Sequence, residues 1–550
     1  MADLATILFL IVTAFANRLI AVQKSTPGFD LYGHLYFVKE VKGQKAGPFG
    51  SIKTKVVGSE NFRNPFVWHW IVGFFPIKIV LKYQRLINSS LDALFSIALY
   101  FVSLRIGFSN TDALLLSLLY LFTPMFFSKL SLGSRINEFT PRLSSELATT
   151  LFFIVTLLPL DIPLWLSLAL GALISFYVLG ASKFGIQALL FITPLTSLFA
   201  QNVTPMIALV CGVLLLLVAS KGDCVATLHE QLRHLGWYFI KNIRGEVPVS
   251  NRNSLKLLFQ RPTRRKGILS WLGVVVSRAL QSNSYTGMFL KLPALWVIVV
   301  IYPSLPFGFE DPLIRALSAP VMAAAVIYLL VNLRWLLFLG EAERYLNHVG
   351  YFIVALFFVS ALNANASWVV YGILAYGFIY WILESAVLSI FFTRSESADD
   401  LVIQYLAEIP EQKVVLAYPF HSGGGVWRIM LETKHKVVYS VTTGKIFTKL
   451  FNEKYASDYP YIDLKKLDSL ADDYDVDVLI VNENDFRIRE SGDLIPSGRW
   501  KKVAVYGDIF AIYERKDIHP NINQSHSSIE ESHYLRHNFN ASEVINVNKD

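Results

Sequence analysis

The chain has 550 residues, of which 53% are hydrophobic, 14% aromatic and only 17% charged, and its formal net charge is +8. Soluble domains carry closer to a quarter charged residues, so this composition excludes a purely water-soluble protein and indicates that much of the chain faces lipid. Lysine and arginine at the ends of membrane spans explain the positive balance, and nucleic acid is therefore not an expected partner. Cys211 and Cys224 form neither a disulfide framework nor a zinc motif.

The first apolar run covers residues 4–22 and lacks the basic n-region and the small-residue cleavage site of a signal peptide. We therefore expect an uncleaved first span. Residues 23–87 form a long loop whose one apolar piece, residues 66–81, contains His69 and Pro76. We interpret that piece as interfacial or re-entrant, an interpretation that sets the side of the membrane for every later loop.

Ten further apolar runs predict, with the first, a bundle of about eleven transmembrane helices, because a span needs ~20 largely apolar residues. Alternation then places the C-terminal part and the loops that begin near 128, 182 and 340 on the same side as the first loop, which we expect to be extracytoplasmic. The basic amphipathic stretch 220–286 falls on that side as well, against a positive-inside tendency that weakens for loops longer than ~60 residues. The runs are 89–104, 111–127, 145–160, 162–180, 185–200, 203–219, 287–303, 313–339, 349–362 and 367–392.

The composition changes after the last apolar run. Short β-branched runs then alternate with helix-like stretches, a pattern typical of a small α/β domain. We therefore expect a transmembrane domain over 1–394 and a soluble α/β domain over 395–516. The remaining residues, 517–550, are rich in Asn, Ser and His without periodicity, and we expect them to be disordered. The predicted fold is mainly α: a polytopic transmembrane bundle with a C-terminal soluble α/β domain.

Asp30 lies a few residues beyond the first span and begins a stretch that carries His34. A carboxylate at the boundary of membrane and water could deprotonate an acceptor hydroxyl as a general base. The alternative is that Asp30 only caps the helix that starts at Leu31, and that His34 is an ordinary interfacial hydrogen bonder. Asp92, just inside a predicted span, is interpreted as a helix N-terminal charge.

An acid in a long first loop resembles the signature position of the GT-C glycosyltransferases. These polytopic enzymes use polyprenyl-phosphate-linked sugars and include protein mannosyltransferases, aminoarabinose transferases and oligosaccharyltransferases. The segment NPFVWHW at 64–70, which contains His69, is similar to the segment that closes this loop in many members. The segment GEAERYL at 340–346, with Glu343 and Arg344, resembles their late Glu-Arg-Tyr loop.

The segment LGSRINE at 132–138 resembles the acidic motif of oligosaccharyltransferases, in which an acid pair helps to bind a divalent cation. Ile136 stands where one acid would be, whereas Glu138 keeps the other. The resemblance therefore assigns no metal ligand here and no certain cofactor, and it leaves Mg²⁺ or Mn²⁺ as an option. The C-terminal domain contains no WWDYG-like segment.

Four cations at span ends fall on the predicted face of the first loop: Arg135, Arg142, Lys183 and Arg344. Arginine pairs bidentately with phosphate and lysine acts as a point charge, so such residues could stabilise a leaving lipid phosphate. The alternative is that they snorkel to the interface as span-end cations commonly do.

The resemblance implies an inverting membrane glycosyltransferase, multi-pass in the plasma membrane, that transfers sugar from a polyprenyl-phosphate donor to a protein, lipid or glycan acceptor. Two alternatives are a transporter or flippase of lipid-linked sugars and a non-catalytic assembly factor with a degenerate GT-C fold. A transporter predicts charges inside the spans, and Arg334 within the run 313–339 is the main instance. The implied catalytic residues are Asp30 and Glu138, and the implied substrate-binding residues are His34, His69, Arg135, Arg142, Lys183, Glu343 and Arg344.

Overall fold

The structure, a computed structural model, describes most of the membrane part and most of the C-terminal domain. Glu138, Arg135 and the tail 517–550 lie outside the described residues. The described residues are 4–22, 29–57, 62–128, 139–243, 252–253, 258–259, 271, 275–276, 278–280, 283–301, 311–391, 398–419, 425–438, 455, 463–483, 498–507 and 509–516.

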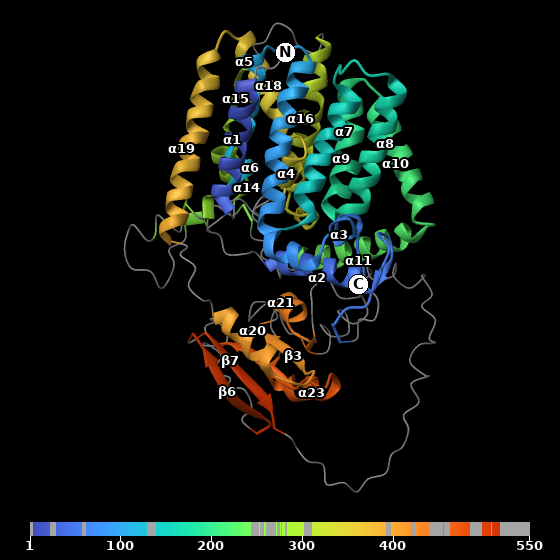
Figure 1. The fold of residues 1–550 in the computed structure, drawn as a ribbon, viewed down its shortest axis with the longest axis vertical. Coiled ribbons are helices and arrows are strands. Elements are labelled where there is room, and N and C mark those ends of the chain that lie inside the picture. Colours follow the sequence, from blue (N-terminus) through green and yellow to red (C-terminus); the bar gives the residue numbers. More distant parts are fainter. Residues whose placement is uncertain are drawn as a thin grey trace, which may run out of the picture.

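A helix occupies each of the eleven predicted apolar runs, and most of these helices stand side by side in one bundle (Figure 1). Among the described residues, five helices are long and apolar enough to cross a membrane alone, or six if one bent pair counts as a single span. The chain is therefore a mainly α-helical, polytopic membrane protein. The helices are α1 (Leu4–Val22), α4 (Ile77–Arg105), α5 (Asn110–Phe122), α7 (Pro141–Leu157), α8 (Leu164–Ala181), α9 (Lys183–Ala200), α10 (Thr204–Ala219), α15 (Pro293–Ile301), α16 (Pro312–Val331), α18 (Gly350–Asn363) and α19 (Ser367–Phe391).

The apolar piece 66–81 of the first loop does not cross the bundle. It consists of the short helix α3 (Val67–Gly73) and the first turn of α4, with Pro76 at the junction. Helix α3, the first-loop helix α2 (Phe29–Gly43) and α11 (Asp223–Ile243) lie across one end of the bundle (Figure 1). The axis turns by 111° between α10 and α11, so the basic amphipathic stretch begins at the same end as the first loop.

Small residues allow close packing within the bundle. A Cβ atom added to Gly212 of α10 would lie 1.8 Å from the Oγ of Ser175 on α8. Such close approach of helix backbones is typical of membrane helices, whose association depends on van der Waals packing and short polar contacts.

The interpretation of Asp92 as a charge at the N-terminus of a helix is wrong. Its carboxylate is fully buried within α4, where the Arg18 Nε lies 2.5 Å from Oδ2 and the Tyr120 hydroxyl donates to Oδ1 at 3.0 Å. Burial of a carboxylate is tolerated because the opposite charge and the hydrogen bonds compensate its lost hydration. Arg334, by contrast, does not lie inside a span, because α16 ends at Val331 and Arg334 follows it as an exposed residue.

The C-terminal domain contains a five-stranded mixed sheet of order β4-β3-β5-β7-β6. Strands β4, β3 and β5 are parallel, whereas β7 runs antiparallel to both β5 and β6. The strands are β3 (Val414–Tyr418), β4 (Lys436–Val437), β5 (Val478–Asn482), β6 (Trp500–Tyr506) and β7 (Phe510–Arg515), and the helices are α20 (Ala398–Glu408), α21 (Gly425–Glu432) and α23 (Leu467–Asp473).

The first loop and the C-terminal domain share one hydrophobic core, which includes Leu31 and Phe37 from α2 and Val402 and Trp427 from the domain. The backbone of the first loop also extends the sheet, because Val56 pairs in parallel with Val437 of β4. The ammonium group of Lys55 donates to the carbonyl oxygens of Met430 and Thr433 at the end of α21. The domain is thus fixed to the membrane part through the first loop.

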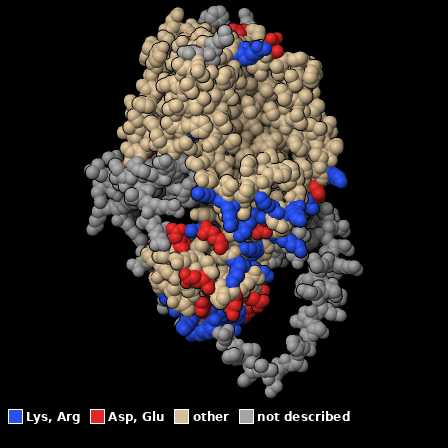
Figure 2. All heavy atoms as spheres, in the orientation of Figure 1, with Lys and Arg blue, Asp and Glu red and all other residues tan. Residues whose placement is uncertain are grey.

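Charged side chains gather at the end of the bundle that carries α2, α11 and the C-terminal domain, while the bundle wall seen in Figure 2 is almost uncharged. At the opposite end, Arg105 and Asp161 form an exposed ion pair with 3.3 Å between Nη2 and Oδ2. The loops near 182 and 340 lie with the first loop rather than with this pair, as the alternation predicts.

Candidate functional site

A cavity of about 250 Å³ lies where the first loop, the bundle and the C-terminal domain meet. Its polar lining comes from segments that are far apart in the sequence. The lining residues are Asp30, Gly33, His34, Phe37, Phe62, Asn64, Thr140, Pro141, Arg142, Ala181, Ser182, Lys183, Phe184, Arg344 and Trp427.

Asp30 lies in the first turn of α2, and Arg142 lies in the first turn of α7, which begins at Pro141. Proline is favoured at the first position of a helix because its missing N–H would have no partner there. The Asp30 Oδ2 and the Arg142 Nη2 are 3.8 Å apart, and the two side chains are 60% and 12% exposed. This distance exceeds that of a hydrogen bond, so the carboxylate faces a cation and remains accessible from the cavity.

Lys183 is the first residue of α9, and Ser182 separates this helix from α8. The Ser182 hydroxyl caps α9 by accepting from the Gly185 N–H at 3.3 Å, which sets the sharp turn that brings Lys183 to the cavity. Within the described part of the chain, the Lys183 ammonium makes no ion pair or hydrogen bond. A cation in this position is available to an anionic ligand.

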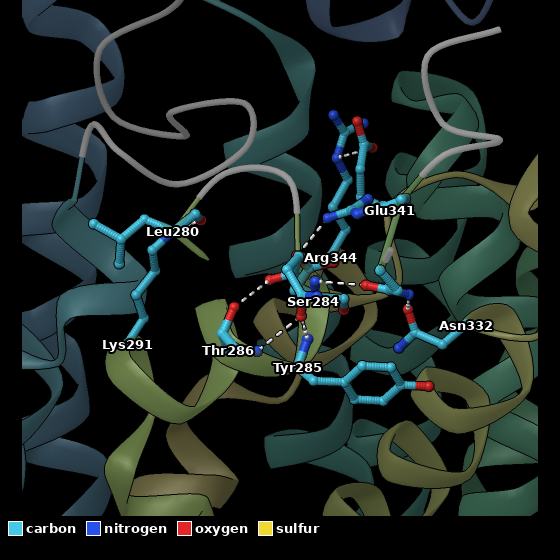
Figure 3. A network of polar contacts seen from close by, with 12 residues as sticks. Leu280, Ser284, Tyr285, Thr286, Lys291, Asn332, Glu341 and Arg344 are labelled. Atoms are coloured by element: carbon cyan, nitrogen blue, oxygen red, sulfur yellow. Dashed lines mark hydrogen bonds and ion pairs between the residues drawn. The ribbon is translucent and has the colours of Figure 1, made fainter. Parts of the chain in front are cut away.

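Arg344 of α17 (Glu343–Asn347) completes the cationic side of the cavity. Its Nε lies 2.6 Å from the Glu341 Oε2, and its guanidinium stacks 4.5 Å from the centre of the Phe184 ring. Burial acts to raise the pKa of Glu341, but Arg344, Arg252 and Arg142 hold that pKa below its ordinary value. Figure 3 shows the Glu341–Arg344 pair within a wider polar network that includes Ser284, Asn332 and Lys291.

His34 lines the cavity one helical turn after Asp30, and His69 of α3 lies behind it, fully buried. The His34 Nδ1 and the His69 Nε2 are 2.9 Å apart. Burial, followed by the charges of Arg142 and Lys183, lowers the pKa of His34 to about 3, and burial also places the pKa of His69 well below its ordinary value. Both rings are therefore neutral at physiological pH.

Trp427 is the contribution of the C-terminal domain to the cavity wall. Its indole packs 3.1 Å from the point where a Cβ would sit on Gly33, so any larger residue at this position of α2 would require the indole to shift. The ring also makes an edge contact with Phe37, with 5.1 Å between the ring centres. The domain therefore forms part of the site rather than an appendage beside it.

A second cavity of about 200 Å³ shares Asn64 with the first. It lies between α8, α9, α10 and α11, and most of its lining is apolar. The lining residues are Pro48, Phe49, Asn64, Pro65, Leu179, Gly180, Ile186, Leu190, Val213, Leu216, Leu217, Cys224, Val225, Thr227, Leu228 and Gln231. A polar, cationic cavity thus adjoins an apolar one at the end of the bundle that carries α2 and α11.

The structure brings five of the sequence-predicted site residues to one cavity: Asp30, His34, Arg142, Lys183 and Arg344. Two others stand apart from its wall. His69 supports His34, and Glu343 forms a partly buried ion pair with Arg252. Arg135 and Glu138 lie outside the described residues.

The sequence analysis missed three residues: Trp427, which lines the cavity, and Glu341 and Arg252, which pair with Arg344 and Glu343 beside it. Glu341 stands in the same segment as Glu343 and Arg344, two positions before Glu343. Arg252 is one of many basic residues in 220–286, and nothing in its neighbours separates it from them. Trp427 carries no sequence signal, because only the packing of α21 on α2 brings it to the cavity.

Among the described residues, no group of three or more His, Cys, Asp or Glu side chains is arranged to hold a metal ion. Of the acids that lie at or beside the cavity in this part of the chain, Glu341 is engaged by Arg344 and Glu343 by Arg252. These residues alone therefore do not form a complete metal site.

No protein family model and no curated protein sequence matches the chain. Several solved structures, however, are similar to it. The chain is similar to ArnT from Cupriavidus metallidurans bound to undecaprenyl phosphate, with a TM-score of 0.52, 13% identity and coverage of 93% of this chain and 98% of that one. It is also similar to the oligosaccharyltransferase from Archaeoglobus fulgidus in complex with Zn and sulfate, with a TM-score of 0.50, 12% identity and coverage of 93% and 73%. The chain has the GT-C fold, as the motifs of its first loop and late loop predict.

Proposed function

We propose that this chain is a membrane glycosyltransferase that transfers a sugar from a polyprenyl-phosphate-linked donor to a hydroxyl-bearing acceptor. The observation that carries the proposal is the position of Lys183, a cation without a partner in the described structure, in the same cavity as the accessible carboxylate of Asp30. A transfer reaction with an anionic leaving group needs a base on one side and cations on the other.

The adjoining cavities suit an amphiphilic donor. A lipid phosphate would place its headgroup among Lys183, Arg142 and Arg344, and the first isoprenoid units would follow the apolar cavity between α8 and α11. The undecaprenyl phosphate bound to the similar ArnT structure supports this assignment.

In the proposed reaction, Asp30 accepts the proton of the acceptor hydroxyl as its oxygen bonds to the anomeric carbon. The bond between that carbon and the phosphate oxygen breaks, and its electron pair leaves with the polyprenyl phosphate. Lys183 and the two arginines stabilise the charge that develops on this phosphate. Attack from the side opposite the leaving group inverts the anomeric centre. Glu138 is a second candidate acid for the acceptor side, and a Mg²⁺ or Mn²⁺ ion remains an option for this site.

The proposal also implies on which side of the membrane the site lies. Polyprenyl-linked donors serve extracytoplasmic transfer, so the end of the bundle that carries α2, α11 and the C-terminal domain would face away from the cytoplasm. The plasma membrane is the proposed location. The acceptor would reach Asp30 between the first loop and Trp427, where the C-terminal domain forms the wall.

The test uses the full-length chain in lipid nanodiscs with undecaprenyl phosphate and with glucosyl and mannosyl undecaprenyl phosphate. Asp30→Asn should bind undecaprenyl phosphate like the unmodified chain but lose transfer by roughly 10²-fold or more, because a positioned base contributes about 10²–10⁴-fold. Glu40→Gln on the same helix, outside the cavity, is the matched control. Transfer retained by Asp30→Asn would refute the assignment of the base, and failure of the unmodified chain to bind the lipid would refute the donor class.

A further inference from the structure

The hydrogen bond between His34 and His69 occupies the Nδ1 of His34 and leaves its other nitrogen, Nε2, for the cavity. The two rings are almost coplanar, with 23° between their planes and 2.9 Å between the His34 Nδ1 and the His69 Nε2. One nitrogen of this pair must carry a proton and the other must not, because a hydrogen bond needs one donor and one acceptor. The other nitrogen of His34, Nε2, makes no hydrogen bond within the described part of the chain.

The surroundings of His69 select between the two arrangements. The His69 Nδ1 makes no hydrogen bond within the described part of the chain, and the Pro65 backbone is the neighbour that favours a proton on this ring. Since the His69 Nε2 faces His34, a proton favoured by that neighbour resides on Nδ1. The His69 Nε2 then accepts from the His34 Nδ1–H, and the His34 Nε2 is left as a bare acceptor.

Packing holds this arrangement in place. Phe37 and Phe66 meet the His69 ring edge-on, with 5.6 Å and 5.7 Å between ring centres. The charged groups nearest the pair are Arg142 of α7 and Lys183 of α9, both cations, together with Asp30 on the helix of His34 itself. The cations oppose a further positive charge on His34, so the ring acts as an acceptor over the physiological pH range and not as an acid.

We propose that His34 accepts, through Nε2, a hydrogen bond from a second hydroxyl of the substrate whose first hydroxyl gives its proton to Asp30, and that His69 is the positioning residue that fixes the His34 tautomer. This inference rests on the proposed function for the role of Asp30 only. Residues four apart lie on one face of a helix with Cβ atoms ≈ 5–6 Å apart, a separation that two hydroxyls of one sugar ring can bridge. One hydroxyl proton cannot serve both acceptors, so two hydroxyls are required.

The arrangement makes His34 a determinant of specificity. A substrate that lacks the second hydroxyl leaves a desolvated acceptor unpaired, which is how sites built around a substrate hydroxyl reject deoxy analogues. The group recognised by Asp30 and the His34 Nε2 together is therefore one that donates two hydrogen bonds, as two hydroxyls of a sugar do.

The first test is ¹⁵N NMR of histidine-labelled full-length protein in nanodiscs without ligand, with His34→Gln used to assign the His34 signals. We expect His34 to be protonated at Nδ1 and unprotonated at Nε2 from about pH 6 to pH 8, below and above the ordinary histidine pKa. A proton on Nε2, or titration of the ring near its ordinary pKa, would overturn the inference. Because no transfer is measured, this result is independent of the fate of the proposed function.

Two variants at position 69 test the positioning role. His69→Gln can offer an amide oxygen to the His34 Nδ1–H and should keep the His34 tautomer, whereas His69→Phe fills the space without an acceptor and should yield a mixture of tautomers. An unchanged tautomer in His69→Phe would show that His69 does not position His34. The NMR signal separates this role from a merely structural one, which would affect both variants alike.

The last measurement adds methyl α-D-glucopyranoside, with its binding detected independently by saturation transfer from the protein to the glycoside protons. A bound glycoside should shift the His34 Nε2 signal in the direction of a hydrogen-bonded acceptor. Glycoside that binds without moving the Nε2 signal would refute the contact.

Discussion

The Asp30 carboxylate and the Arg142 guanidinium face each other on the wall of one cavity, with 3.8 Å between Oδ2 and Nη2. A closed bidentate pair would bind the acid more tightly and lower its basicity. The longer distance and the exposure of Asp30 leave the carboxylate able to accept a proton while Arg142 lies beside it on the cavity wall. This loose pair thus joins the acceptor side and the donor side of the proposed site.

Lys183→Met should weaken the binding of undecaprenyl phosphate by about 10- to 100-fold, because a hydrogen bond to a charged group contributes about 1.5–3 kcal/mol. The matched control is Lys53→Met, an exposed first-loop lysine outside the cavity. Equilibrium binding of the lipid to the protein in nanodiscs measures the effect. Equal affinity in Lys183→Met and Lys53→Met would exclude Lys183 from the phosphate site.

Gly33→Val should reduce transfer and loosen the contact between α2 and the C-terminal domain. The added side chain meets the Trp427 indole, whose nearest atom lies 3.1 Å from the new Cβ, and overpacking of this kind costs about 1–3 kcal/mol. The double variant Gly33→Val with Trp427→Leu should recover part of the stability but not the shape of the cavity. Melting temperature and transfer rate, measured side by side, check both expectations; a fully active Gly33→Val would argue against Trp427 as a wall of the site.

Stability should fall as the pH drops from about 6.5 towards 3. Burial and neighbouring cations lower the pKa of His34 to about 3 in the folded chain, and the pKa of His69 is also lowered. In this window the unfolded chain binds more protons than the folded chain, so each histidine removes up to about 1.4 kcal/mol per pH unit. Melting temperatures at pH 5 and pH 7 measure the effect, and the double variant His34→Gln with His69→Gln should show a shallower pH dependence. An identical slope in that variant would contradict the assignment.

Asp92→Asn should destabilise the bundle by about 3–5 kcal/mol, because it leaves the buried Arg18 without its counter-charge. Ser96→Ala, one turn further along α4 and also buried, removes only a hydroxyl and should cost much less. Replacement of both charges by Arg18→Met and Asp92→Leu should recover most of the loss, since an uncharged pair needs no compensation. Thermal unfolding in detergent distinguishes the variants, and equal melting temperatures of Asp92→Asn and Ser96→Ala would show that the pair contributes no stability.

The composition and the apolar runs of the sequence were sufficient to predict a polytopic membrane bundle followed by an α/β domain, because lipid exposure and strand periodicity leave direct patterns in residue order. The short motifs at Asp30, His69 and Arg344, through their order and their shared predicted face, indicated the GT-C fold. Pattern alone misplaced Asp92, because an acid near a predicted helix start has the same appearance whether it faces solvent or a buried arginine.

Only the tertiary structure decided which of these residues meet. Trp427 reaches the cavity because α21 packs on a glycine of α2, and Glu341 rather than Glu343 pairs with Arg344 because of the turn that precedes α17. The tautomer of His34 depends on His69, 35 residues away in the sequence. Such relationships arise from packing between distant segments, and packing leaves no periodic trace in any one of them. The sequence by itself determined the membrane architecture and offered Asp30 as a candidate base, while the folded chain determined the shape of the cavity and the partners of its charges.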